Sequence, residues 1–384
     1  MTVRCAKKIK RTMASSINSA SCESSEALLS VQELIKKPLT SVPQRYITRL
    51  HNHEPSSVQD ETLSHAIPTI SLKKLIHGGA TKTEQEKLNS ACKDWGFFQL
   101  VEHGISPQVL KTLKDEIEGF FGLPLEEKMK YKIRPDDVEG YGAVIRSEDQ
   151  KLDWGDRLYM ITNPLGRRKP YLLPELPSSL RRILEVYIVE LQNLAMTFLG
   201  LLGKALKIEK REWEVFEDGM QSVRMTYYPP CPQPERVMGL TAHSDATGIT
   251  ILNQVNGVHG LQIKKHGIWI PVNVASDALI LNIGDILELM SNGLYKSVEH
   301  RAIVNSTKER ISIAMFFAPK FQSEIEPAAS LTGRENPPLY KKIKMEKYVN
   351  DFFTRKLDGK SYLEHMKITD ENASNVMKLN SSCN

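Results

Sequence analysis

Cysteine is scarce in this chain of 384 residues, and its five cysteines are scattered without a CxxC pair. Such spacing indicates neither a zinc ribbon nor a disulfide framework. Long apolar runs are missing too: none approaches the roughly 20 residues that span a bilayer, and none near the N-terminus has the form of a secretory signal. We therefore expect a cytoplasmic protein of a reducing compartment, without a membrane as its partner.

Acidic residues are absent from residues 1–22, which are basic and rich in serine. Five basic residues within residues 1–12 account for the whole net charge of +5, so the rest of the chain is neutral. A neutral body lacks the basic surface that is typical of nucleic-acid binding. The N-terminal composition is also that of a transit peptide, which leaves a plastid or mitochondrial location open. Met13 is an alternative start, which would give a shorter chain.

Several catalytic motifs are missing from the sequence. It has no glycine-rich phosphate loop, no Gly-x-Ser-x-Gly turn and no His-Glu-x-x-His helix. Their absence argues against nucleotide hydrolysis, serine esterase chemistry and the common zinc hydrolases. No coiled-coil heptad appears either, so we expect a monomer that acts on a small molecule.

The composition that is present suits a folded soluble chain, with 41% apolar and 25% charged residues. Residues 213–325 contain many short apolar runs separated by turn residues such as Asn256-Gly257. That pattern favours a β-sandwich or barrel, with a jelly roll among the options.

The other regions are expected to be mainly helical or irregular. Residues 135–175 lack periodicity and are interpreted as a long surface segment near a site. Ser178 or Ser179 is expected to cap a long helix that ends near Lys207 and braces the sheet. The expected regions are a partly disordered arm at 1–60, an N-terminal region at 61–175, the bracing helix at 176–212, the core at 213–325, and a C-terminal helix and tail at 326–384.

Two histidines and one aspartate form a candidate metal site. His243 and Asp245 are two residues apart, so on an extended segment both side chains point to the same face. His300 follows several expected strands later, and a double-stranded β-fold can return it beside them. Two imidazoles and a carboxylate on one face of a metal leave three positions open, as in non-haem iron(II) oxygenases. A lone His-x-Asp is weak evidence, because most histidines only satisfy surface or core hydrogen bonds.

Arg310-Ile311-Ser312 is the only Arg-x-Ser triplet in the chain. On an extended strand Arg310 and Ser312 share a face, and a buried arginine needs an anion to neutralise it. The strand contains no acidic residue. The pair therefore predicts a pocket for a ligand carboxylate, with Tyr228 as a further hydroxyl donor. The alternative is an arginine paired with a distant Asp or Glu.

These residues lie among longer motifs, which belong to a resemblance that covers roughly residues 30–365. The motifs are Trp95-Gly96-Phe97-Phe98-Gln99-Leu100, His103-Gly104, Gly140-Tyr141-Gly142, Lys151-Leu152-Asp153-Trp154, Tyr227-Tyr228-Pro229-Pro230-Cys231-Pro232, Asn282-Ile283-Gly284-Asp285 and Leu357-Asp358-Gly359-Lys360-Ser361-Tyr362-Leu363. With them the chain resembles the plant iron(II)/2-oxoglutarate-dependent dioxygenases. Within that family it resembles the senescence-related and norcoclaurine-synthase-like branch, which also contains alkaloid O-demethylases.

The resemblance implies a mainly β fold with flanking helices, in which a double-stranded β-helix (jelly-roll) core is joined to a helical N-terminal region and one long bracing helix. It also implies that His243, Asp245 and His300 ligate iron(II). Arg310 and Ser312 would hold the distal carboxylate of 2-oxoglutarate, and Tyr228 would help to hold its other end. With O2, and ascorbate as reductant, such enzymes release succinate and carbon dioxide and hydroxylate a substrate. Hydroxylation of an O-methyl carbon releases formaldehyde and a free phenol.

Three positions depart from the family pattern. Thr226 stands where the family commonly has Asn, so the affinity for 2-oxoglutarate is in question while the iron site is not. Glu102 and Ser71 replace an Asn and an Asp in the N-terminal region, where they are expected to affect packing more than catalysis.

The resemblance also implies a substrate pocket, for which Tyr141, Tyr159, Arg224 and Phe316 are the candidates. For each aromatic, core packing is an equally good interpretation, and Arg224 is as well suited to pair with a structural acid. Aromatic side chains near iron favour a flat, apolar alkaloid or phenolic substrate. Two other functions stay open: a non-oxidative, norcoclaurine-synthase-like condensation of an amine with an aldehyde, and ligand binding without catalysis.

Overall fold

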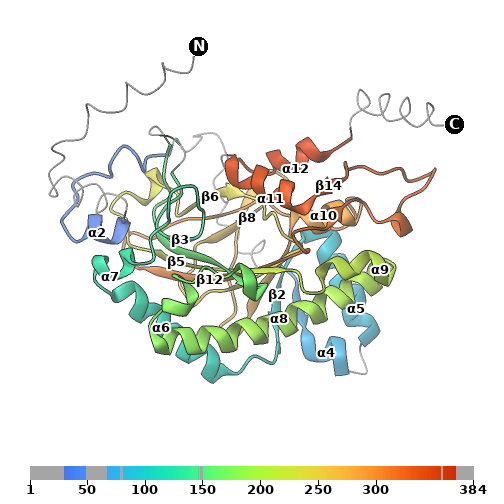
Figure 1. Ribbon diagram of the computed structural model, residues 1–384, viewed down its shortest axis with the longest axis horizontal. Helices are drawn as coiled ribbons and strands as arrows, with labels where there is room; N and C mark the ends of the chain where they lie inside the picture. Colours follow the sequence, from blue (N-terminus) through green and yellow to red (C-terminus); the bar gives the residue numbers. More distant parts are fainter. Residues whose placement is uncertain are drawn as a thin grey trace, which may run out of the picture.

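The computed structural model describes residues 30–48, 67–77, 81–145, 147, 150–355 and 358–368. Most of the N-terminal arm expected at residues 1–60 and the tail after residue 368 lie outside the described residues. The strands form an eight-stranded sheet, a four-stranded sheet and a small two-stranded sheet. Side chains from the first two sheets together line the site described below, and helices cover the outer face of the larger sheet (Figure 1).

The eight-stranded sheet has the order β1-β2-β10-β7-β12-β5-β4-β3, and only β1 and β2 run parallel. Inside this sheet, between β2 and β7, β10 is buried along its whole length, as its apolar sequence Leu279-Ile280-Leu281 leads one to expect. The strand bounds are β1 Thr69–Ser71, β2 Phe97–Val101, β3 Gly140–Tyr141, β4 Asp156–Asn163, β5 Met220–Tyr228, β7 Ile249–Asn253, β10 Leu279–Ile283 and β12 Arg310–Ala318.

The four-stranded sheet has the order β6-β11-β8-β9, and its strands are antiparallel. It carries both histidines of the candidate metal site. The bounds are β6 Leu240–His243, β8 Leu261–Lys265, β9 Ile268–Pro271 and β11 His300–Ala302. The third sheet pairs β13 Glu324–Ile325 with β14 Ile343–Lys344.

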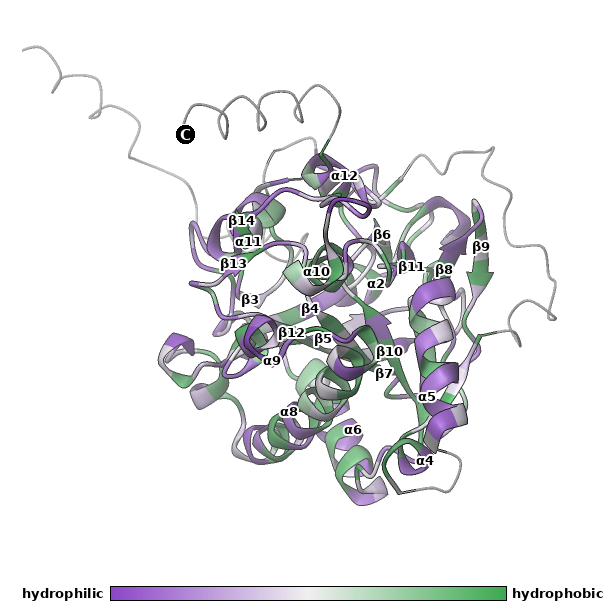
Figure 2. Ribbon diagram, turned by 90° about the vertical axis from the view of Figure 1, so that its right-hand side faces the viewer, coloured by the Kyte–Doolittle hydropathy of each residue, from purple (hydrophilic) through white to green (hydrophobic). Residues whose placement is uncertain are grey.

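Helix α8 (Ser178–Leu206) runs beneath the larger sheet beside α6 (Pro107–Gly122), as Figure 1 shows. Among the described helices, α8 alone is long and apolar enough to span a membrane by length and composition. Its apolar side packs into the main core, which accounts for that composition, and Figure 2 shows hydrophobic residues concentrated on it and on the nearby strands β7 and β10. The expected serine cap is wrong: Pro177 holds the cap position, and Ser179 instead donates to Glu116.

The remaining helices flank the sheets. On the side opposite α8 lie α10 (Asp285–Met290), α11 (Met345–Thr354) and α12 (Ser361–Met366), as Figure 1 shows. The others are α2 Val31–Ile35, α4 Leu72–His77, α5 Thr81–Ser90, α7 Leu125–Met129 and α9 Lys210–Trp213, with a π-helical turn at Ala91–Trp95 and 3-10 turns at Leu165–Arg167, Leu173–Glu175, Glu214–Phe216, Pro234–Arg236 and Ala329–Leu331.

The predicted fold class is confirmed, but the prediction for one segment is wrong. Residues 135–175 were expected to run over the surface, whereas β4 within them is a full strand of the main sheet that pairs with β5 along its length. Its buried side chains include Leu158 and Met160. Sequence periodicity missed it because the buried face of β4 carries the polar Asp156 and Thr162 beside Leu158 and Met160, so apolar residues do not alternate along the strand although burial nearly does. The five regions proposed for the chain stay a prediction.

Two of the departures from the family pattern are partners in the structure. The Ser71 hydroxyl donates to the Glu102 carboxylate at 2.6 Å, at the ends of the parallel strands β1 and β2. Both residues lie at the ends of the two strands at one edge of the main sheet, and neither lines a cavity at the metal ligands. This contact is structural and agrees with the expectation that these residues affect packing.

Candidate metal centre and substrate pocket

His243, Asp245 and His300 are brought together by the smaller sheet. His243 ends β6 and faces His300 at the start of β11, because the two strands are antiparallel and in register at this pair. Asp245 follows two residues after the end of β6. One ligand atom of each residue lies within 4.8 Å of the others, and all three side chains are buried. The Nε2 atoms of His243 and His300 lie 3.5 Å and 3.6 Å from the same Asp245 oxygen, Oδ1.

Backbone carbonyls orient both imidazoles toward that point. His243 Nδ1 lies 2.8 Å from the Thr241 carbonyl oxygen, and His300 Nδ1 lies 3.1 Å from that of Val298. A carbonyl oxygen can only accept, so each Nδ1 must carry the proton and each Nε2 keeps its lone pair. Burial lowers the pKa of His300 and so favours the neutral ring that a metal requires.

The Asp245 carboxylate is held by its other oxygen. Oδ2 accepts from the Thr250 hydroxyl at 2.6 Å and from the Asn282 amide at 2.9 Å, which leaves Oδ1 facing the imidazoles. Burial alone would raise the pKa of Asp245, but the positive charge of His300 and His243 whenever they are protonated, together with the Thr250 bond, holds it well below its usual range. A neutral, oriented pair of imidazoles beside an ionised carboxylate fits a divalent iron ion on the donor set alone.

Arg310 is a buried cation without an acidic partner among the described residues. Its guanidinium donates weakly to Ser312 at 3.5 Å and lies 5.0 Å from the centre of the Tyr228 ring. Its Nε has no hydrogen-bond partner in the part of the chain that the structure describes. A Cβ on Gly260 would lie 2.9 Å from the Arg310 Cδ, so glycine makes the room for this side chain. The alternative of a distant acidic partner is therefore not met within the described residues, and the orphaned guanidinium fits a carboxylate ligand.

One small cavity of about 50 Å³ joins the arginine to the metal ligands. Its lining includes Tyr228, His243, Asp245, His300, Arg310 and Ser312. Thr226 lines it as well and lies opposite Ser312 across β5 and β12. The residues that the sequence assigned to the metal and to the dicarboxylic acid thus lie around a single space between the two sheets.

A larger cavity of about 430 Å³ opens from the same ligands, because His243 and Asp245 line both spaces. One wall is aromatic. Tyr159 of β4 lies 6.5 Å from Phe316 of β12 and 6.0 Å from Phe353 of α11, measured between ring centres. A cavity of this size suits a small organic molecule, and its rings suit a flat one.

Three of the four predicted substrate residues line this larger cavity: Tyr159, Arg224 and Phe316. Arg224 donates to the Thr226 hydroxyl at 3.2 Å and lies where the two cavities meet. Tyr141 does not belong to the group. Its ring is buried in the core beside Phe120, and its hydroxyl donates to the buried Asp156 carboxylate at 2.9 Å. For Tyr141, core packing is the correct interpretation.

Sequence reasoning missed several residues of the site. Phe352 and Phe353 of α11 line the larger cavity, although they follow His300, the last metal ligand, by some fifty residues. Asp153 is half-buried on its wall and accepts from both the backbone amide and the hydroxyl of Thr241. Asn282 holds Asp245, and it alone carried a signal in the sequence: an amide within the otherwise apolar run of β10.

Comparisons with known proteins agree with this geometry. A family model described as the 2OG-Fe(II) oxygenase superfamily matches residues 219–319, and one described as non-haem dioxygenase in morphine synthesis N-terminal matches residues 67–177. Codeine O-demethylase of Papaver somniferum is 48% identical over 348 residues, which are 88% of this chain and 96% of the relative. Oxoglutarate-dependent flavonoid 7-O-demethylase 1 of Ocimum basilicum is 47% identical over 340 residues, 88% and 90% of the two chains.

Among solved structures, that of JOX2 in complex with 2OG, Fe and JA is similar with a TM-score of 0.79 and 34% identity, covering 88% of this chain and 98% of that one. The fold and the site define a non-haem iron oxygenase. The chain belongs to the 2OG-Fe(II) oxygenase superfamily, in the plant branch that contains the O-demethylases. It is an oxidoreductase that uses Fe(II) and 2-oxoglutarate, as the resemblance in the sequence implied.

Proposed function

We propose that this dioxygenase hydroxylates or O-demethylates a small alkaloid or phenolic, with an aromatic methyl ether as the preferred substrate. The observation that carries the proposal is the aromatic-lined cavity of about 430 Å³ that opens directly on the metal ligands. The names of the two O-demethylase relatives, one acting on an alkaloid and one on a flavonoid, point in the same direction.

In this proposal His243, Asp245 and His300 hold Fe(II), and Arg310 and Ser312 hold the distal carboxylate of 2-oxoglutarate with Tyr228 beside them. Bound together, the metal and 2-oxoglutarate supply an oxidant for a substrate C–H bond, and ascorbate keeps the metal reduced. Tyr159 and Phe316 contact the flat face of the substrate and exclude water, and Arg224 contacts a polar group at the junction of the two cavities. O2 provides one oxygen atom to succinate and one to the methyl carbon, which leaves as formaldehyde.

The decisive experiment measures succinate and formaldehyde from the purified protein with Fe(II), 2-oxoglutarate, ascorbate and O2. A panel of methoxylated alkaloids and methoxylated flavonoids provides the substrates, and their demethylated analogues provide matched controls. We expect succinate and formaldehyde in equal amounts with a methyl ether, and no formaldehyde with its demethylated analogue. His243→Ala is expected to abolish both, and substrate-dependent turnover that survives in this variant would end the proposal.

The condensation of an amine with an aldehyde is the second candidate. This reaction uses neither O2 nor 2-oxoglutarate, so it supplies no carboxylate ligand to pair with the buried Arg310. Product formation that continues without oxygen and in an Arg310→Ala variant would favour it over oxygenation.

For its surroundings we propose a monomer in the cytoplasm, without nucleic acid or membrane as partner. The support is the near-neutral charge outside residues 1–12 and the burial of α8 in the core. A plastid or mitochondrial location is the alternative. Imaging of the full chain and of a chain that begins at Met13 distinguishes the locations, and sedimentation of the purified protein tests the monomer.

A further inference from the structure

The C-terminal motif singled out in the sequence lies against the strand that carries the first metal ligand. We call its described part, Asp358–Leu363, the clasp. The Gly359 amide donates to the Ala242 carbonyl oxygen at 3.2 Å, and its own carbonyl oxygen accepts from the Ser244 amide at 3.2 Å. These two contacts flank His243 on either side. Gly359 has a φ of +51°, and a Cβ there would lie 3.1 Å from the Glu299 carboxylate, so this approach requires glycine.

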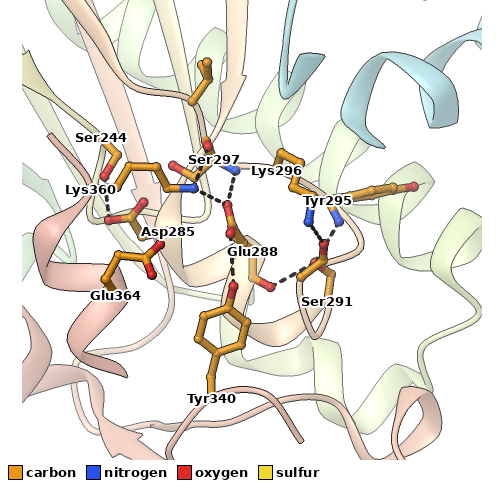
Figure 3. Close-up of polar contacts among 12 residues, drawn as sticks. Ser244, Asp285, Glu288, Ser291, Tyr295, Lys296, Ser297, Tyr340, Lys360 and Glu364 are labelled. Carbon is orange, nitrogen blue, oxygen red and sulfur yellow. Dashed lines mark hydrogen bonds and ion pairs between the residues drawn. The ribbon is translucent and has the colours of Figure 1, made fainter. Parts of the chain in front are cut away.

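A mostly buried ion pair fastens the clasp. Lys360 Nζ donates to Glu288 of α10 at 2.7 Å and to the Ser297 carbonyl oxygen at 2.8 Å (Figure 3). The Glu288 carboxylate also accepts from the Ser297 amide at 2.6 Å and from the Tyr340 hydroxyl at 3.0 Å. Its side chain is only 6% exposed, and that of Lys360 is 23% exposed. A pair with this many partners and this little solvent holds one geometry.

Helix α10 connects this ion pair to the loop that carries Asp245. The Asp285 amide donates to the Asp245 carbonyl oxygen at 2.7 Å. The Asp285 carboxylate accepts from the Ser244 hydroxyl at 2.9 Å, beside the Lys360 side chain in Figure 3. The clasp and α10 therefore support the metal-ligand segment together from its outer side.

The other end of the clasp packs against a wall of the substrate cavity. The Tyr362 ring lies 4.7 Å from the Tyr348 ring and 6.3 Å from the Phe352 ring, and its hydroxyl donates to Asp351 at 3.3 Å. All three partners belong to α11. The cavity lining from that helix consists of Met345, Val349, Phe352 and Phe353.

We propose that the clasp is a positioning element that couples the metal-ligand strand β6 to the aromatic wall on α11, with Lys360 as its central residue. This inference deepens the proposed function and rests on it. The separation between the metal ligands and the aromatic wall on α11 decides which substrate atom is oxidised. Lys360 contacts neither cavity, so it acts through Gly359 and Tyr362 rather than on the substrate. A loosened clasp lets 2-oxoglutarate be consumed without oxidation of the substrate.

The test compares Lys360→Met with Lys360→Arg and with Lys367→Met in the full chain. Lys367 is the matched control, because it lies at the end of α12 and pairs with Glu364 at the surface. We expect Lys360→Met to raise the KM for the methyl ether about three- to tenfold and to lower the product formed per succinate. The KM for 2-oxoglutarate is expected to stay unchanged. Lys360→Arg is expected to recover most of the coupling, and Lys367→Met to match the parent protein.

Hydrogen–deuterium exchange over residues 345–354 provides a readout that needs no turnover. Lys360→Met is expected to speed exchange there and leave the β12 peptides unchanged. Equal exchange and equal product per succinate in Lys360→Met and Lys367→Met would overturn the proposal, and so would a parallel rise in the KM for 2-oxoglutarate. If Lys360→Met fails to fold, Tyr362→Leu tests the same coupling from the α11 side. If the parent protein is inactive on every methyl ether, the proposed function is rejected. The hydrogen–deuterium exchange result would still show whether Lys360 couples β6 to α11.

Discussion

Thr226 and Ser312 lie directly opposite each other on the neighbouring strands β5 and β12. Both line the small cavity between the metal ligands and Arg310, and Thr226 already accepts from Arg224 at 3.2 Å. The family commonly carries an amide at the position of Thr226. In the proposed cradle for 2-oxoglutarate, Arg310 supplies the charge, and Thr226 supplies a hydroxyl where the resemblance implies an amide donor.

Restoring that donor tests the consequence. Thr226→Asn is expected to lower the KM for 2-oxoglutarate about two- to tenfold, the range of one net hydrogen bond. Thr226→Ser, which keeps only the hydroxyl, is the matched control and is expected to leave this KM unchanged. Steady-state succinate release against 2-oxoglutarate concentration measures both variants. A higher KM in Thr226→Asn would show that the pocket of this chain is shaped for threonine.

Arg310→Gln is expected to raise the KM for 2-oxoglutarate at least about 30-fold, because removing a buried charge leaves the ligand carboxylate unpaired. Binding of Fe(II), measured by equilibrium dialysis, is expected to stay unchanged, since the ligand set is untouched. Arg211→Gln is the control, an exposed arginine with 77% of its side chain accessible. Simultaneous loss of iron binding would contradict separate roles for the two groups.

Phe316→Ala is expected to raise the KM for an aromatic substrate about tenfold through the loss of ring contact in the larger cavity. The KM for 2-oxoglutarate is expected to change little. The measurement is formaldehyde release against methyl ether concentration. An unchanged substrate KM would return Phe316 to a packing role.

Tyr141→Phe is expected to leave the substrate KM unchanged and to lower the free energy of unfolding by about 1 kcal/mol. The hydroxyl that it removes bonds the buried Asp156 carboxylate, which also accepts from the Ser30 hydroxyl at 2.6 Å and the Val31 amide at 2.7 Å. Urea unfolding of both proteins gives the energy difference. A substrate KM that rises in Tyr141→Phe would restore the original prediction that Tyr141 lines the pocket.

Glu139 is expected to make stability depend on pH. Burial raises the pKa of this carboxyl above its usual value of 4.5, against the bond from the Ile161 amide, while nearby Asp137 adds to the rise. In the unfolded chain the group loses its proton near pH 4.5, whereas the folded chain keeps it to higher pH. The free energy of unfolding therefore falls as pH rises from about 4.5 to the raised folded pKa, by at most about 1.4 kcal/mol per pH unit.

Glu139→Gln keeps an acceptor for the Ile161 amide and removes the titration. Urea unfolding from pH 4.5 to 8 is expected to show the variant gaining stability relative to the parent as pH rises, and then a constant difference. The exposed Glu126→Gln is the control and is expected to show no such trend. A difference that is the same at every pH would contradict the raised pKa.

Residue chemistry and short spacing were enough to pair His243 with Asp245 and Arg310 with Ser312, whereas the family resemblance implied their roles and added His300 to the metal ligands. Arg310 and Ser312 share a face of β12 because strand side chains alternate. His243 and Asp245 are two residues apart, which keeps their side chains close although β6 ends at His243. Each pair is separated by only two residues, so its proximity can be predicted from the sequence. The long helix and the strand-rich core were also predictable, because each depends on a repeated pattern of apolar residues.

Only the tertiary structure decided which distant residues meet. The register that sets His300 opposite His243, the entry of β4 into the main sheet and the burial of Tyr141 all depend on long-range pairing. The same holds for the contact of Lys360 with Glu288, which are 72 residues apart. No local pattern encodes such contacts, because a buried strand or ion pair is defined by what packs against it. The sequence by itself determined the chemistry of this protein, and the packing of its chain determined the shape of the space in which that chemistry acts.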